Sequence, residues 1–84
     1  MDIVVGDLLT VDGKKYLTIE VLEYENNKYA FVSKLTDEDE NTGEFYIFKA
    51  MYDGVRIIVE DNLKNILIPK FQELIQKDIK DLMQ

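Results

Sequence analysis

The chain has 84 residues, of which 46% are hydrophobic, 17 are acidic and 10 are basic, and it contains no histidine and no cysteine. A chain of this length forms one core, so we predict a single domain over residues 1–84. The missing histidine leaves the only serine, Ser33, without the base that a Ser-His catalytic site needs. Because a phosphate-binding glycine motif is also missing, we expect no enzymatic activity, no cofactor and no bound metal.

The net charge of −7 is unevenly placed along the chain. Residues 1–60 hold thirteen acidic and six basic residues, whereas residues 61–84 hold four of each. An acidic surface repels a nucleic-acid backbone, so we expect no direct binding to DNA or RNA. No apolar run approaches the ~18 residues of a membrane span, and the first residues lack a signal-peptide pattern. We therefore expect a cytoplasmic protein that does not bind membranes.

The first predicted strands, residues 7–11 and 14–25, flank Asp12-Gly13. This dipeptide is typical of a two-residue hairpin turn, because both of its residues accept positive φ angles. We predict a second hairpin around Asn26-Asn27, followed by a third strand. A two-residue turn there places Glu25 opposite Lys28, Tyr24 opposite Tyr29 and Leu22 opposite Phe31.

Four consecutive acids, Asp37, Glu38, Asp39 and Glu40, follow the third strand. Their mutual repulsion and the lack of apolar neighbours predict a mobile, solvated loop. An EF-hand calcium loop is the alternative, but Thr42 stands where that loop needs glycine and Phe48 where it needs glutamate. We therefore interpret the run as an acidic contact loop that binds no metal.

A third hairpin is predicted around Asp53-Gly54, between strands 44–52 and 55–60. The turn places Tyr52 opposite Val55 and Phe48 opposite Val59. One face of this hairpin is apolar, and we predict that it forms the core. Its members are Tyr46, Phe48, Ala50, Tyr52, Val55, Ile57 and Val59.

The spacing of apolar residues changes from two to about 3.6 after Asp61, which predicts a helical C-terminus over residues 61–84. Asp61 is the expected N-cap, and Pro69 is expected to break the helix. We predict a short helical turn at 62–67 and a main helix from Pro69, whose apolar stripe packs on the sheet. The stripe consists of Phe71, Leu74, Ile75, Ile79 and Leu82.

Both faces of the second hairpin are apolar, and a single helix cannot cover both. One face carries Leu17, Ile19, Val21, Ala30 and Val32. The other carries Leu22, Tyr24, Tyr29, Phe31 and Leu35. Either the sheet curls into a partial barrel, or a second copy forms a homodimer, or another protein covers one face. In the last two cases the predicted partner interface consists of Leu22, Tyr24, Tyr29 and Phe31.

The pattern of strands and acids over residues 17–75 resembles the YrzB-like family. The similarity rests on residues 19–32, the acidic run 37–40, residues 44–48, and residues 58–61 leading into a helix with Phe71 and Leu74. The family comprises short acidic proteins of unknown function from Gram-positive bacteria, and similar openings occur in small phage-borne proteins. The resemblance implies no site residues.

From the residues we expect an α+β fold: an antiparallel meander of about five strands with a C-terminal helix packed on it. The expected function is a non-enzymatic protein-interaction module that binds a protein partner, with self-association as one form. The alternative is a phage-type acidic inhibitor that binds a basic site on a host protein through residues 37–40.

Overall fold

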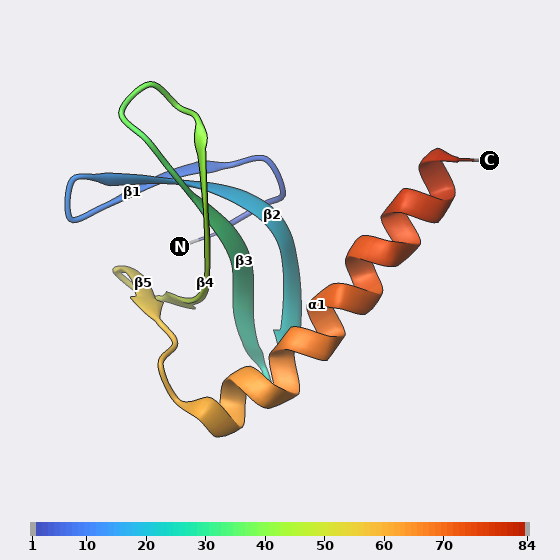
Figure 1. Cartoon of the computed structure of the whole chain (residues 1–84). Helices are drawn as coiled ribbons and strands as arrows, with labels where there is room; N and C mark the ends of the chain where they lie inside the picture. The colour runs from blue at the N-terminus through green and yellow to red at the C-terminus, as the bar shows by residue number, and fades with distance from the viewer. Residues whose placement is uncertain (1, 84) are drawn as a thin grey trace.

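The computed structural model describes residues 2–83 as a five-stranded antiparallel sheet and one helix. The strands follow chain order across the sheet, so the α+β meander predicted from the sequence is confirmed (Figure 1). No helix in this part of the chain has the length and apolar character needed to cross a membrane. The elements are β1 (Leu8–Val11), β2 (Lys14–Tyr24), β3 (Asn27–Leu35), β4 (Asn41–Met51), β5 (Gly54–Ile57) and α1 (Asp61–Leu82).

The first hairpin has the predicted turn. Asp12 and Gly13 take φ angles of 52° and 76°, and Val11 pairs with Lys14. Two successive positive φ angles match the right-handed twist of the flanking strands.

In the second hairpin the predicted register is wrong by two residues. Glu25 and Asn26, with φ angles of 50° and 66°, form the turn, so Tyr24 pairs with Asn27 and Leu22 with Tyr29. The Asn27 side chain donates to the carbonyl of Glu25 at 3.2 Å, which favours this turn over the predicted one. Because side chains alternate with a period of two, the shift leaves the residues near the turn on their predicted faces; beyond a bulge between Thr18 and Glu20 the faces are exchanged, so that Tyr16 joins the inner cluster in place of Leu17.

The third hairpin is displaced in the same way. Met51 pairs with Gly54 and Phe48 with Ile57, so Tyr52 and Asp53 form the turn. Neither of these two residues takes a positive φ angle, and Gly54 takes one as the first residue of β5. The predicted turn at Asp53-Gly54 is therefore not formed.

The sheet curls into a half-barrel, which confirms the first of the three ways of covering its apolar faces (Figure 1). The curl is strongest in β2, where a bulge between Thr18 and Glu20 bends the strand. Residues from the first and last strands meet on the inner face, with Ile3 of the N-terminal segment among them. The buried members of this inner cluster are Ile3, Leu9, Tyr16, Ala30, Val32 and Phe48.

Helix α1 covers part of the outer face. Leu67 and Phe71 are buried there against Tyr29, Ile47 and Ile58. The Phe71 ring lies 5.6 Å from the ring of Phe31, centroid to centroid. The predicted packing of the helix on the sheet is confirmed for Phe71, but it is wrong for Ile79 and Leu82 of the predicted stripe, which are 51% and 86% exposed because the helix extends past the sheet.

The third hairpin contributes less to the core than predicted. Phe48 is fully buried, and Tyr46, Ala50 and Val55 are partly buried. The register shift moves Tyr52 into the turn, where its side chain is 100% exposed. Ile57 and Val59 are exposed because the chain leaves the sheet after β5.

The predicted helix break at Pro69 is wrong, because α1 runs through it from Asp61 to Leu82. Asp61 is the first helical residue and not the N-cap, which is Glu60 without a capping side-chain bond. Proline inside a helix removes the bond to the carbonyl four residues earlier, here Asn65. Burial of Leu67 and Phe71 on either side of Pro69 offsets this loss.

Replacing the proline tests this balance. We expect Pro69→Ala to raise the free energy of unfolding by about 2 kcal/mol, because it restores the backbone donor and removes the clash at Asn65. Urea unfolding followed by circular dichroism measures the change. Gln72→Ala, an exposed position one turn later, is the control and should change stability by less than about 0.5 kcal/mol. An unchanged or lowered stability of Pro69→Ala would show that the ring itself is needed.

Candidate interaction groove

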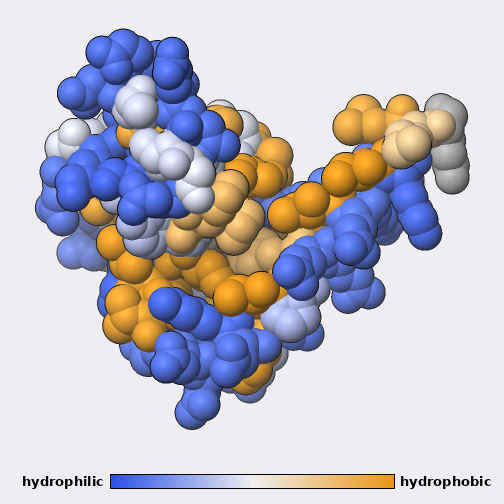
Figure 2. Space-filling view, in the orientation of Figure 1, coloured by the Kyte–Doolittle hydropathy of each residue, from blue (hydrophilic) through white to orange (hydrophobic). Residues whose placement is uncertain are grey.

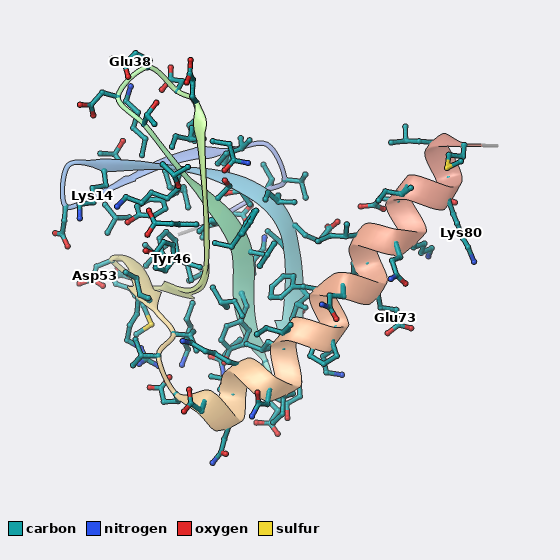
Figure 3. The ribbon with its side chains drawn as sticks, in the orientation of Figure 1. Lys14, Glu38, Tyr46, Asp53, Glu73 and Lys80 are labelled. Atoms are coloured by element: carbon teal, nitrogen blue, oxygen red, sulfur yellow. The ribbon has the colours of Figure 1, made fainter. Side chains whose placement is uncertain are left out.

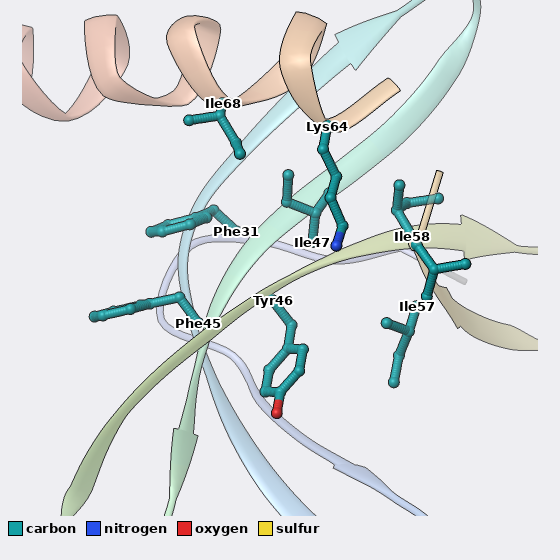
Figure 4. Close-up of a pocket in the computed structure, with 9 residues that line it drawn as sticks. Phe31, Phe45, Tyr46, Ile47, Ile57, Ile58, Lys64 and Ile68 are labelled. Atoms are coloured by element: carbon teal, nitrogen blue, oxygen red, sulfur yellow. The ribbon is translucent and has the colours of Figure 1, made fainter. Parts of the chain in front are cut away.

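A groove opens where β5 separates from β4. The two strands pair only from Phe48 to Met51, and the N–H of Ile58 donates to the carbonyl of Ile47 at 2.8 Å just beyond the last pair. The chain then turns away towards α1. An ion pair of 2.9 Å between Arg56 and Glu60 spans this turn. The groove lies between β4, residues 57–59 and the first turns of α1 (Figure 4).

The groove is lined almost entirely by apolar side chains and has a volume of about 330 Å³. Phe31 and Phe45 stack at one end, with ring centroids 5.4 Å apart and planes inclined by 4° (Figure 4). Phe45 is half exposed, so this aromatic surface faces solvent. The lining residues are Phe31, Phe45, Tyr46, Ile47, Ile57, Ile58, Val59, Lys64 and Ile68.

The outer edge of β4 borders the groove. From Asn41 to Ile47 this edge has no strand paired beside it within residues 2–83. The carbonyl of Ile47 points outwards to Ile58, and backbone direction alternates along an antiparallel strand. The N–H and C=O of Phe45 therefore point to the same outer side. This arrangement gives an extended chain two backbone groups to pair with, next to an apolar surface.

Lys64 supplies the only charged side chain of the groove lining (Figure 4). Three other lysines, Lys15, Lys28 and Lys34, make ion pairs. For Lys64 the described part of the chain provides no carboxylate within ion-pair distance. An unpaired ammonium at the side of an apolar groove favours an apolar ligand that carries a carboxylate.

The structure brings the predicted interface residues together on the outer face, but mostly beneath α1. Tyr29 is buried, and Leu22, Tyr24 and Phe31 are partly covered. The Lys70 ammonium lies 5.6 Å above the ring of Tyr24. Burial raises the pKa of the Tyr29 hydroxyl. Of these four residues, only Phe31 also lines the groove.

The acidic loop has more internal contacts than the sequence indicated. The Lys15 ammonium donates to a carboxylate oxygen of Asp39 at 2.9 Å and to the backbone carbonyl of Asp37 at 3.3 Å. Thr36 closes the loop, since its N–H donates to the Glu40 carbonyl at 2.7 Å and its hydroxyl accepts from the Glu40 N–H. The side chain of Glu38 lies at the outer end of the molecule (Figure 3). Within residues 2–83 no group of three acids is placed to hold a metal ion.

A second contact between α1 and the sheet is made by two carboxyl groups. Glu20 of β2 is largely buried, and its carboxyl lies beside that of Asp78 on α1. Burial and the neighbouring Asp78 carboxyl both raise the pKa of Glu20. Two carboxyl groups attract each other only while one of them is protonated, so we expect the contact between α1 and β2 to depend on pH.

The sequence contained a signal for the groove that the predictions did not use. Phe45, Tyr46, Ile47 and Phe48 are four consecutive apolar residues, a pattern typical of a strand with apolar residues on both faces. Only Tyr46 and Phe48 were assigned to the core, so Phe45 and Ile47 implied a second apolar surface on β4. No pattern in the sequence indicated that Lys64 and Ile68 line the groove, because their positions depend on α1 continuing unbroken through Pro69.

Comparison of the chain with protein-family models, curated proteins and solved structures finds no match. The resemblance of residues 17–75 to the YrzB-like family stays a prediction.

The Glu20–Asp78 contact predicts an unusual pH profile. Because the pKa of Glu20 is raised above its ordinary value of 4.5, its stabilising contribution is complete below pH 4.5 and is lost as pH rises through the raised pKa. We expect Glu20→Gln, which keeps a donor for Asp78, to increase the free energy of unfolding at pH 7 and to flatten its fall above pH 4.5. Urea unfolding at several pH values between pH 4.5 and pH 7 measures both effects.

Glu23→Gln, an exposed position on the same strand, is the matched control and should leave the profile unchanged. If the Glu20→Gln profile runs parallel to that of the wild type, the two carboxyl groups do not share a proton in solution.

Proposed function

We propose that the protein is a non-enzymatic interaction module that holds an extended, apolar segment of a partner protein along the outer edge of β4. The observation that carries this proposal is the free edge of β4 beside the apolar groove. An added strand pairs its backbone with that of Phe45. Every second side chain of the added strand then lies on the outer face of the sheet, between Phe45 and Ile68.

The charges of the molecule favour a different protein over a second copy at this edge. The sheet carries the whole excess of negative charge, so edge pairing of two copies would bring two acidic sheets together. Lys64 adds a local preference for a carboxylate on the bound segment. The partner segment therefore has alternating apolar residues and one acidic side chain or a C-terminal carboxylate near Lys64.

Selection from a library of displayed random peptides tests the proposal. We expect wild-type protein to enrich peptides with alternating apolar residues and an acid, with micromolar affinity, and the amide resonance of Phe45 to shift on binding. Phe45→Asp and Ile68→Glu, on opposite walls, should abolish binding. Lys64→Glu should weaken it about tenfold through charge reversal.

Tyr52→Asp is the control, because Tyr52 is an equally accessible aromatic outside the groove. Circular dichroism checks that each variant is folded. Peptides that bind the Phe45→Asp protein as tightly as the wild type would refute the groove as the binding site.

A second candidate function is an acidic inhibitor that covers a basic site on a nucleic-acid-binding protein. Asp37, Glu38 and Glu40 support it, because they are exposed and their side chains have no ion pair within residues 2–83. Asp39 contributes less, since Lys15 neutralises it. A surface of this kind binds through long-range attraction that salt weakens.

Displacement from DNA-cellulose tests the second candidate. A nucleic-acid-binding protein of a Gram-positive host is first bound to the DNA-cellulose. We expect the wild-type protein to release it at about 0.1 M salt, because the acidic loop occupies the basic site of the host protein. The triple variant Asp37→Asn, Glu38→Gln, Glu40→Gln should release none. A control with the same net charge, Asp12→Asn, Glu25→Gln, Asp53→Asn, should behave like the wild type. Equal loss in both triple variants would assign the effect to net charge alone and exclude a loop-specific site.

A further inference from the structure

Helix α1 has two apolar ridges, and only one of them faces the sheet. Leu63, Leu67 and Phe71, spaced by four residues, pack on the outer face of the sheet. A second ridge consists of Ile68, Gln72, Ile75, Ile79 and Leu82. Its spacings of four, three, four and three are those of the a and d positions of a coiled coil. On a helical wheel the second ridge lies about a quarter-turn from the first. We call residues 68, 72, 75, 79 and 82 the seam.

All seam residues except Ile75, which is partly buried, are exposed, and exposure is greatest at the C-terminal end of the helix. Ile68 is 39% exposed and lies beside the groove, Ile79 is 51% exposed, and Leu82 is 86% exposed. The distal half of α1 extends beyond the sheet in Figure 1, and Figure 2 shows a continuous apolar line along it. A helical segment of this length is marginal in water unless its apolar face is packed. The chain's own sheet does not supply that packing beyond Asp78, which contacts Glu20.

The polar side of the distal half is already suited to water. Glu73 and Lys77 are spaced as an i,i+4 pair of opposite charge, and Glu73 and Lys80 point away from the sheet in Figure 3. The positions that flank the seam hold Gln76 and Met83, and Asp78 is the one charged residue there. A partner at the seam therefore meets an uncharged surface with one carboxyl at its side.

The distribution of charge favours a second copy of this chain as the occupant. Residues 61–84 are neutral, with four acids and four bases, in a protein whose other residues carry all seven excess negative charges. Two copies therefore approach each other through their helices with the least repulsion. Antiparallel helices place the two acidic sheets at opposite ends of the pair, whereas parallel helices place them side by side.

We propose that the seam of α1 pairs with the seam of a second copy of this chain, in an antiparallel helix pair with twofold symmetry. An axis beside Lys77 places Ile75 of each copy opposite Ile79 of the other, and Gln72 opposite Leu82. The contact covers about one and a half heptads, which corresponds to a small interface and to a dimer that dissociates at micromolar concentrations. Gln72, as a polar seam residue, weakens the pair and helps to fix its register. Ile68 also lines the groove beside β4, but the four seam residues that pair in the dimer, Gln72, Ile75, Ile79 and Leu82, lie outside that groove.

Sedimentation velocity between about 5 µM and about 500 µM tests the dimer, since mass action shifts its population over this range. We expect Ile79→Gln to raise the dissociation constant at least about tenfold, the loss expected for an apolar side chain removed from a seam. Lys80→Gln, the adjacent residue on the polar face, is the matched control and should leave it unchanged. Both residues are exposed in the single chain, so circular dichroism should show both variants folded.

A gain of affinity is the sharper test. Gln72→Leu completes the apolar seam and should lower the dissociation constant at least about tenfold. A wild-type protein and a Gln72→Leu variant that both remain monomeric at the highest concentration would overturn the proposal. A dimer that is insensitive to Ile79→Gln but lost in Phe45→Asp would also overturn it, and would place self-association at the β4 edge.

Discussion

The structure depends on the need to bury both faces of one small sheet. β3 is the centre of this constraint, because Ala30 and Val32 point to the inner cluster while Tyr29 and Phe31 point to the outer one. A flat sheet would leave one of these faces in water. The bulge in β2 lets the sheet curl around the inner cluster, and Phe71 fixes α1 on the outer face. The groove, the position of Lys64 and the overhang of α1 all follow from where Phe71 lies.

Much of the fold could be predicted from local patterns. Asp12-Gly13 predicted its turn correctly because both residues accept the positive φ angles that the turn requires. Asn26-Asn27 and Asp53-Gly54 indicated hairpins in the right places but not their registers. In each case the turn begins one residue earlier than predicted. The predicted and the observed register bury the same faces. The side-chain hydrogen bond of Asn27 selects the register of the second hairpin, and the position of Gly54 selects that of the third. Alternation alone does not separate them.

The helix and the groove could not be predicted from local rules. Pro69 normally ends a helix, but packing on either side of it supplies more free energy than the missing hydrogen bond removes. That tertiary effect brings Lys64 and Ile68 to the side of β4. The sequence-based interface of Leu22, Tyr24, Tyr29 and Phe31 was correctly recognised as one apolar patch, yet most of it lies beneath α1. Predicting this required the position of the helix, which depends on the sheet's curl.

The free half of β4 also bears on how the protein avoids aggregation. Unpaired strand edges are templates on which identical chains add strand after strand. Here Gly43 takes a φ angle of 81° and its N–H bonds to the Asn41 side chain at 2.9 Å, which breaks the extended edge on one side. Ile58 ends it on the other. The remaining stretch around Phe45 is long enough to pair with one short strand of a partner and too short to seed a growing fibril. The edge is therefore accessible to a partner without promoting aggregation.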